Sequence, residues 1–439
     1  MEKSDLIPYL LLWIAAAVLL LWQSWRQRGS GLILAYCFQL FALYFLGGLI
    51  HTLPWSDLPQ TEFARLGIQK AAFAMVAFAA GSFVAAKIAA RLQSKERAVS
   101  EANPSLPRQY IIYGIAFYFV ISPTIGRLPG LNAVGAVGAE LVVVGLSLNC
   151  WLAWSRGGMK PWLAKVAPAF LLPIVTIVVQ GFANYGVMAL STVIAFSAQF
   201  FRPRWVLLAT GVIAGWVGLS GYAAYMQNRS VIRATVWGGA PMAERLDVLG
   251  QAFSGAEWFD FRNPDHLAFV DSRLNQVSLV GSAVVNLSNT GGYAHGGTLL
   301  DAVIAMIPRL IWPSKPVTAG SGDLVSQFTG QEFASGTSVG VGPLLELYGN
   351  FGDAGVWIGF VILGAMIQLI DSMAGWYLSV GNWYSFATWF LVGIAWLNVS
   401  GSFVECTAAA AASILVARIL NSTLRKSVPG FAATSPAPV

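Results

Sequence analysis

Long apolar runs restrict the folds open to this chain more than any other feature of its sequence. An α-helix needs about 20 mostly apolar residues to cross a bilayer, and helical runs of that length recur from one end of the chain to the other. We predict eleven such runs, near 6–22, 31–50, 66–90, 109–126, 131–153, 162–181, 184–201, 204–225, 343–370, 382–400 and 402–420. The sequence therefore predicts an all-α polytopic membrane protein with about eleven transmembrane helices.

The composition excludes a soluble protein of this length. Of the 439 residues, 56% are hydrophobic and only 10% are charged, whereas soluble domains carry about 25% charged residues. The net charge of +6 is what an excess of Lys and Arg on the cytoplasmic side produces, and we expect no nucleic-acid partner. Cys37, Cys150 and Cys406 all lie in apolar segments, so no disulfide framework is expected.

Basic residues in the short connections predict the orientation. Fifteen Lys and Arg residues fall on one side, four on the other, and seven lie in the long loop. The side with fifteen is expected to be cytoplasmic. This places the N-terminus outside, the C-terminus inside and the long loop outside.

The spans divide the chain into four regions. Residues 1–225 form an N-terminal bundle of about eight spans, 226–342 a long extracytoplasmic loop, 343–420 three C-terminal spans, and 421–439 a disordered cytoplasmic tail. Loops of this length are uncommon unless they have a function. There is no internal repeat, which disfavours a repeat-built transporter.

Three stretches of the loop carry helical signals. Residues 241–253 place an apolar stripe after a proline. A helix through 274–284 is expected to be capped by Asp271 or Ser272. Thr298 and Asp301 have capping-box spacing, and that helix is expected to stop at Pro308. The loop is therefore expected to be a small helical subdomain against the membrane.

The turn "IPRLIWPSKP", residues 307–316, places two cations in a rigid, proline-rich segment. Arg309 offers a planar fork and Lys315 a point charge, and both suit phosphate oxygens. The alternative is an interfacial anchor, with Trp312 in the aromatic belt and both cations at lipid headgroups. The residues alone leave both interpretations open.

Other polar residues in or beside spans are further candidates. Glu346, one turn inside a span, is either a structural partner of an arginine or a base, because an unpaired acid there is costly. His295, in a glycine-rich loop, is incidental or exposed to a cleft. Asp371 is expected to be solvated at the cytoplasmic end of its span, and Glu140 to pair with Arg127.

The missing motifs narrow the chemistry. The sequence has no P-loop, no D-x-D pair, no H-E-x-x-H and no Cys–His zinc spacing. An enzyme outside the cytoplasm has no ATP, so its substrate must already be activated. A lipid pyrophosphate fits, since its leaving group demands Arg and Lys. We expect no metal and no cofactor.

The ordered motifs resemble those of the Wzy-type oligosaccharide repeat-unit polymerases. The resemblance rests on "GGYAHGGTLLDAVIAMIPRLIWPSKP" (291–316) followed by "GPLLELYGNFGDAGVWIG" (342–359), with Arg273 upstream. The positions that match are Pro308, Arg309, Trp312, Pro313, Lys315 and Pro316, then Glu346, Tyr348, Gly349, Asn350, Phe351 and Gly352. The specific match covers roughly 273–360; elsewhere only the number of spans and the position of the loop agree.

This resemblance implies a GT-C-like glycosyltransferase in the bacterial inner membrane. Such enzymes transfer a growing glycan between undecaprenyl-pyrophosphate-linked oligosaccharides at the periplasmic face, among membrane lipids, alongside a flippase and a chain-length regulator. It implies pyrophosphate or glycan binding by Arg273, Arg309, Trp312, Lys315, Tyr348 and Asn350. Glu346 or His295 would be the base. The rivals are an O-antigen ligase, which uses the same donor, and a polysaccharide or lipid transporter.

Overall fold

Every regular element that the structure describes is a helix, as the apolar runs predict. The computed structural model describes residues 3–93, 103–125, 132–201, 204–307, 309, 311–316, 318–333 and 339–426. The α-helices are α1 (Ile7–Arg26), α2 (Leu32–Leu40), α3 (Leu46–Thr52), α4 (Thr61–Gln93), α5 (Leu106–Ala116), α6 (Ser122–Ile125), α7 (Asn132–Gly157), α8 (Met159–Val166), α9 (Leu172–Gln180), α10 (Asn184–Ala198), α11 (Arg204–Trp237), α12 (Met242–Ser254), α13 (Pro264–Leu274), α14 (Val277–Thr290), α15 (Gly297–Ala305), α16 (Ser321–Thr329), α17 (Gly342–Ser379), α18 (Trp383–Ala395) and α19 (Phe403–Lys426). Short 3₁₀ segments are η1 (Lys3–Leu6) and η4 (Ala167–Leu171), and π-helical turns are η2 (Phe41–Phe45) and η3 (Phe117–Ile121).

Among the described residues, seven helical stretches are long and apolar enough to cross a membrane, which supports a helical membrane protein. They are Ser4–Arg26, Leu32–Thr52, Thr61–Gln93, Ala133–Gly157, Met159–Gln180, Gly342–Ser379 and Phe403–Lys426. Two shorter apolar helices, α10 and α18, and the helices α5, α6 and α11 coincide with the other four predicted runs. A helix thus lies at each expected position, while the total of eleven spans and the GT-C-like arrangement stay predictions.

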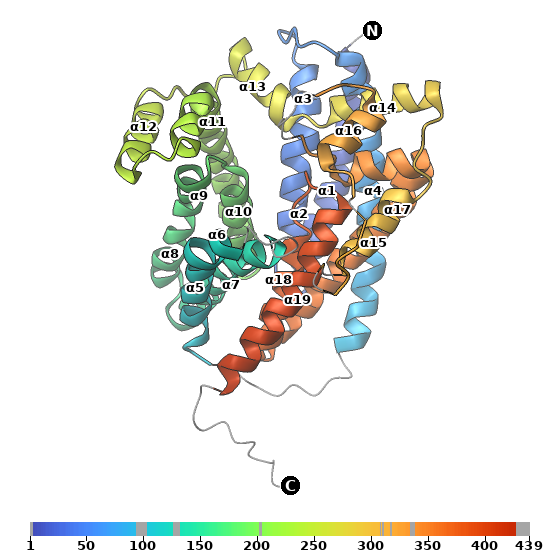
Figure 1. Cartoon of the computed structure of the whole chain (residues 1–439). Helices are drawn as coiled ribbons and strands as arrows, with labels where there is room; N and C mark the ends of the chain where they lie inside the picture. Colours follow the sequence, from blue (N-terminus) through green and yellow to red (C-terminus); the bar gives the residue numbers. More distant parts are fainter. Residues whose placement is uncertain are drawn as a thin grey trace.

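The helices stand in two groups (Figure 1). Helices α5 to α12 form one group, and α1 to α4 with α14 to α19 form the other. Contacts of α7 with α18 and α19, and of α10 with α2, join the two. The first turns of α1 and the last turns of α19 lie at opposite ends of the bundle. The side of the membrane that each end faces stays a prediction.

Helices α4 and α17 form the most extensive helix pair of the core. Gly81 of α4 touches the backbone of Val361, and Gly364 of α17 touches the backbone of Phe78, so that a Cβ at either glycine would collide. Small residues at such crossings let two membrane helices approach backbone to backbone. This contact holds the start of α17 in a fixed place.

Helix α17 is broken near its N-terminal end. Phe351 and Gly352 have non-helical backbone angles, and Gly352 has a φ of 60°, which only glycine adopts readily. The break separates a wholly buried segment, 342–350, from the long remainder of the helix. The polar side chains on the short segment therefore face protein rather than lipid.

The loop 226–342 contains five helices, α12 to α16, and the final turns of α11. Helix α12 lies at the helix predicted over 241–253, but of its apolar stripe only Leu249 is buried, while Met242, Leu246 and Phe253 are exposed. Helix α14 packs closely on α4, where Gly281 touches the backbone of Phe63, and α15 packs on α19. The later part of the loop is thus packed into the bundle.

Two of the predicted caps are wrong. Asp271 and Ser272 lie in the last turn of α13, and the next helix begins only at Val277, whose N–H is bound by Asn275 Oδ1 at 3.0 Å. The hydroxyl of Thr298 accepts a hydrogen bond from Asn350 Nδ2 at 2.7 Å, and α15 begins after Gly296. Both polar groups have tertiary partners, which the local spacing does not reveal.

The expectation that Asp371 is solvated is also wrong. Its side chain is 2% exposed, and Oδ1 accepts hydrogen bonds from Ser30 N (3.0 Å), Ser30 Oγ (3.0 Å) and Leu32 N (2.7 Å). It caps the start of α2 from another helix. The proposed partner of Glu140, Arg127, lies outside the described residues, as do Pro308 of the turn and residues 427–439 of the tail.

Candidate functional site

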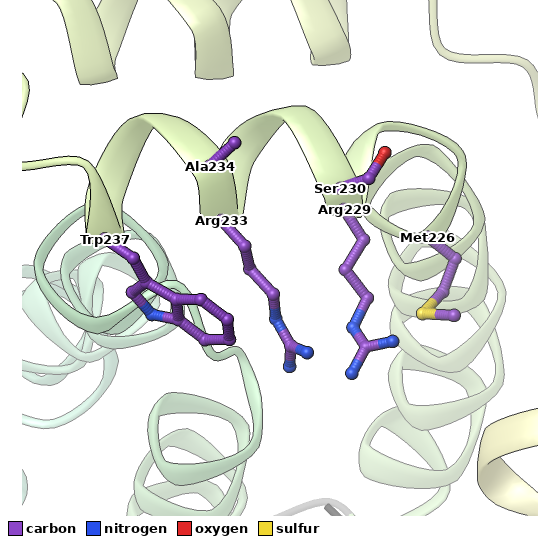
Figure 2. Close-up of a pocket in the computed structure, with 6 residues that line it drawn as sticks. All are labelled: Met226, Arg229, Ser230, Arg233, Ala234 and Trp237. Carbon is purple, nitrogen blue, oxygen red and sulfur yellow. The ribbon is translucent and has the colours of Figure 1, made fainter. Parts of the chain in front are cut away.

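A cavity of about 480 Å³ opens beside the last turns of α11 (Figure 2). Two arginines one helical turn apart, Arg229 and Arg233, point their guanidinium groups into it side by side. Residues four apart lie on the same face of a helix, so α11 itself sets this pairing. The other lining residues are Met226, Ser230, Ala234 and Trp237.

Arg233 is held in position by its surroundings. Its Nε donates to the carbonyl of Gly181 at 3.3 Å, and the guanidinium lies 4.4 Å from the ring of Phe182 and 5.2 Å from that of Trp237. Burial is the main cause that lowers the pKa of Arg233. The charge is thus partly shielded from water by a fixed aromatic wall, which strengthens its attraction for an anion.

Arg273 of α13 adds a third positive charge. Helix α13 contacts α11, and burial, and next the charge of Arg229, lower the pKa of Arg273. The ion pairs formed by the described residues, His51–Asp271 and Lys70–Asp353, do not include any of the three arginines. The paired guanidinium groups of Arg229 and Arg233 form a site for an anion such as phosphate, and Arg273 on the neighbouring helix adds to the positive charge around it.

A buried polar cluster holds α13 against α3. Asp271 Oδ1 lies 2.9 Å from His51 Nε2 and accepts from Asn275 Nδ2 at 2.6 Å. His51 Nδ1 is 3.1 Å from the hydroxyl of Thr61. Because Asp271 is two residues from Arg273, this cluster fixes the helix that carries the third arginine.

The break in α17 gathers a second group of the predicted site residues. Asn350 donates to the carbonyl of Glu346 at 2.7 Å, and its Oδ1 accepts from Gly296 N at 2.9 Å. The backbone N–H of His295 donates to the carbonyl of Asn350 at 3.2 Å, and Tyr348 lies against Tyr293, with ring centroids 6.3 Å apart. The structure therefore brings together Glu346, Tyr348, Asn350 and the backbone of His295.

The two candidate bases have opposite surroundings. Glu346 is 0% exposed; its Oε2 accepts from Phe403 N at 2.8 Å, and Oε1 is buried without a partner among the described residues. His295 is exposed and has a φ of 48°, in the left-handed region. Of the two, only His295 is accessible to a large substrate.

In the proline-rich turn, both cations form hydrogen bonds with nearby backbone carbonyls. Arg309 donates from Nη1 to the carbonyl of Lys315 at 2.8 Å and from Nη2 to that of Pro316 at 3.2 Å. Lys315 Nζ donates to the carbonyls of Ala305 and Ile307, both at 3.1 Å. Trp312 Nε1 donates to Ser314 Oγ. Burial, and then Arg309, lower the pKa of Lys315. Phosphate binding by this turn stays a prediction.

The arginine pair of α11 was not among the predicted site residues. The sequence does contain a signal for this arginine pair: no Asp or Glu occurs from 141 to 243. Arg229 and Arg233 therefore have no acid nearby along the chain. Lys70, buried on α4 beside Tyr348 and paired with Asp353, was likewise missed.

The sequence model of one protein family, described as a domain of unknown function (DUF8712), matches residues 69–393. The chain belongs to this family. The matched region contains both arginines of α11, Arg273 and the broken start of α17. None of the curated proteins and none of the solved structures matches the chain.

Proposed function

We propose that this protein is a glycosyltransferase that polymerises undecaprenyl-pyrophosphate-linked oligosaccharide repeat units at the periplasmic face of the bacterial inner membrane. The observation that supports it most is the cavity on α11, where Arg229 and Arg233 point into one space, with Arg273 on the neighbouring helix α13. A pyrophosphate leaving group carries the charge that such a site attracts. The order of motifs from 273 to 360 supports the same function.

In the proposed reaction, a hydroxyl oxygen of the acceptor sugar attacks the anomeric carbon of the donor glycan. The bond from that carbon to the pyrophosphate oxygen breaks, and the hydroxyl proton passes to a base. The arginines stabilise the negative charge that grows on the departing pyrophosphate. Both candidate bases, His295 and Glu346, lie in the helix group of α14 to α19, whereas the arginine pair lies on α11 in the other group. Of the two, His295 is the more accessible to an acceptor, because its side chain is exposed while that of Glu346 is buried.

The remainder of α11 suits a lipid substrate. Below the cavity, Val212 is 76% exposed and Ile213 63% exposed, and added Cβ atoms at Gly211 and Gly215 would meet nothing within 4 Å. An apolar, uncovered helix half that leads to a cationic cavity matches a molecule with a long hydrocarbon tail and an anionic head. Such continuity favours a lipid-linked donor over a soluble sugar phosphate.

The test is elongation by the purified protein. With a lipid-pyrophosphate-linked oligosaccharide and EDTA, we expect a ladder of longer lipid-linked glycans. A strict need for a divalent metal or for a nucleotide sugar would refute the proposal. Transfer of the glycan to a lipid core, without longer chains, would assign the protein to the ligases instead.

A transporter is the second candidate, and one observation favours it. Helix α17 is discontinuous and carries the buried carboxyl group of Glu346 beside the break, and substrate sites of many transporters lie at such broken helices. The elongation assay separates the two functions. A transporter would move intact lipid-linked oligosaccharides across a vesicle membrane without lengthening them.

A further inference from the structure

The outward face of α15 and of the turn after it is apolar. Leu300 is 61% exposed and Val303 62%, and their spacing of three residues places them on one side of α15. Ile307, just after the end of the helix, is 39% exposed. Ile311, in the turn, is 75% exposed, and Trp312 is 37% exposed. A row of large apolar side chains of this kind is unusual on a surface that faces water.

The cations of this segment bind backbone carbonyls of the segment itself. The guanidinium of Arg309 binds the carbonyls of Lys315 and Pro316, and the ammonium of Lys315 binds those of Ala305 and Ile307. These carbonyls belong to the end of α15 and to an irregular turn, where helical partners are missing. Water could satisfy them at an aqueous surface, whereas a lipid phase offers no partner. A turn that lies in lipid therefore needs hydrogen-bond donors from the protein itself for these carbonyls.

The neighbours of α15 are candidate membrane spans. Thr407 of α19 donates to the carbonyl of Ala302 at 2.6 Å, and Asn350 of α17 donates to Thr298. Figure 1 shows α15 alongside α17 and the upper part of α19. Both spans expose apolar side chains, including Ile358 (63%) and Leu415 (47%). The apolar face of α15 thus lies beside two candidate spans that expose apolar side chains of their own.

We propose that α15 with residues 309 and 311–316 forms a membrane-inserted wedge, whose outer face lies in the acyl-chain region beside the first turns of α17 and α19. Arg309 and Lys315 act in it as caps for backbone carbonyls, and Leu300, Val303 and Ile311 contact lipid tails. The occupant of this face is the bilayer itself. The inference does not depend on the proposed reaction.

The depth of a fluorescent probe at position 311 tests the wedge. The described native cysteines are all buried, so Ile311→Cys can carry an NBD group in the full-length protein in phosphatidylcholine vesicles. Leu415→Cys, on the exposed side of α19, is the reference for a lipid-facing site. Ser272→Cys, exposed on α13, is the reference for an aqueous site, and unsubstituted protein corrects for background labelling.

We expect NBD at position 311 to emit at shorter wavelength than at 272. We also expect nitroxide groups on the acyl chains to quench it as strongly as the probe at 415, and aqueous iodide to quench it weakly. Quenching by iodide and not by lipid nitroxide would overturn the proposal. A blue-shifted probe that neither reagent quenches would also overturn it, because a second protein copy would then cover the face. Val303→Cys repeats the measurement if the variant at 311 does not fold.

Discussion

Replacing Arg229 with glutamine tests whether this arginine binds an anion or only supports the fold. Arg229 points into the cavity, one turn from Arg233, and its charge contributes to the lowered pKa of Arg273. At about 4 Å and an effective dielectric constant near 20, a unit charge on phosphate gains roughly 4 kcal/mol from such a guanidinium. Measured hydrogen bonds to charged groups contribute about 1.5–3 kcal/mol.

These magnitudes predict the size of the effect. A loss of about 1.5–3 kcal/mol corresponds to a roughly 10- to 100-fold fall in kcat/KM for the lipid-linked donor, at about 1.4 kcal/mol per factor of ten. The fall reaches about 10²–10³ if the contact strengthens as the pyrophosphate leaves. The matched control is Arg262→Gln, the same change in the same loop, because Arg262 lies over the ring of Trp55 instead of in the cavity.

The change in Tm of the substrate-free protein distinguishes an anion-binding arginine from a structural one. Removing one of three neighbouring like charges relieves repulsion, so the Tm of Arg229→Gln should equal or exceed that of the unsubstituted protein. Added pyrophosphate should raise the Tm of the unsubstituted protein more than that of the variant. Elongation by Arg229→Gln equal to that by Arg262→Gln, or a lower Tm with reduced elongation, would refute the anion site.

Three further substitutions test the contacts described above. Lys315→Met removes two hydrogen bonds to carbonyls at the end of α15 and should lower the free energy of unfolding by about 3 kcal/mol. An unchanged Tm in detergent would contradict the capping role. Asp371→Ala should sharply reduce folded protein on size-exclusion chromatography, whereas Asp371→Asn keeps an acceptor and should be milder; equal behaviour of the two would count against the cap. His295→Ala should lower elongation by about 10²–10⁴ at normal Tm, while Glu346→Gln should stay active, and the reverse result would make Glu346 the base.

The helices were predictable because their signals are local. Span length and apolar content belong to single runs of sequence, and a helix lies at each predicted run. The helix ends in the loop were less predictable, since Thr298 and Asp271 have partners on other helices. The burial of Asp371 depends on Ser30, which is 341 residues away in the chain, so no local pattern could reveal it.

The candidate site was predictable only in part. The motifs located the break in α17 and the turn at 309–316, because their glycines, prolines and aromatics are adjacent in sequence. The partners of Arg309 and Lys315 are backbone carbonyls, which a sequence does not display as ligands. The approach of Arg273 to Arg229 requires α13 to be fixed on α3, a contact between residues 220 positions apart.

Because of the π-helical turn η2, the fold depends on the number of residues in the second span as much as on their apolar character. The N–H of Leu46 bonds to the carbonyl of Phe41, five residues back, so the turn holds one residue more than an α-helical turn. Each residue added to or removed from a helix rotates everything beyond it by about 100°. Deleting one residue from 41–45 would therefore swing His51 away from Asp271 and release the helix that carries Arg273. Apolar exchanges at these positions should be tolerated, whereas a change of a single residue in length should not.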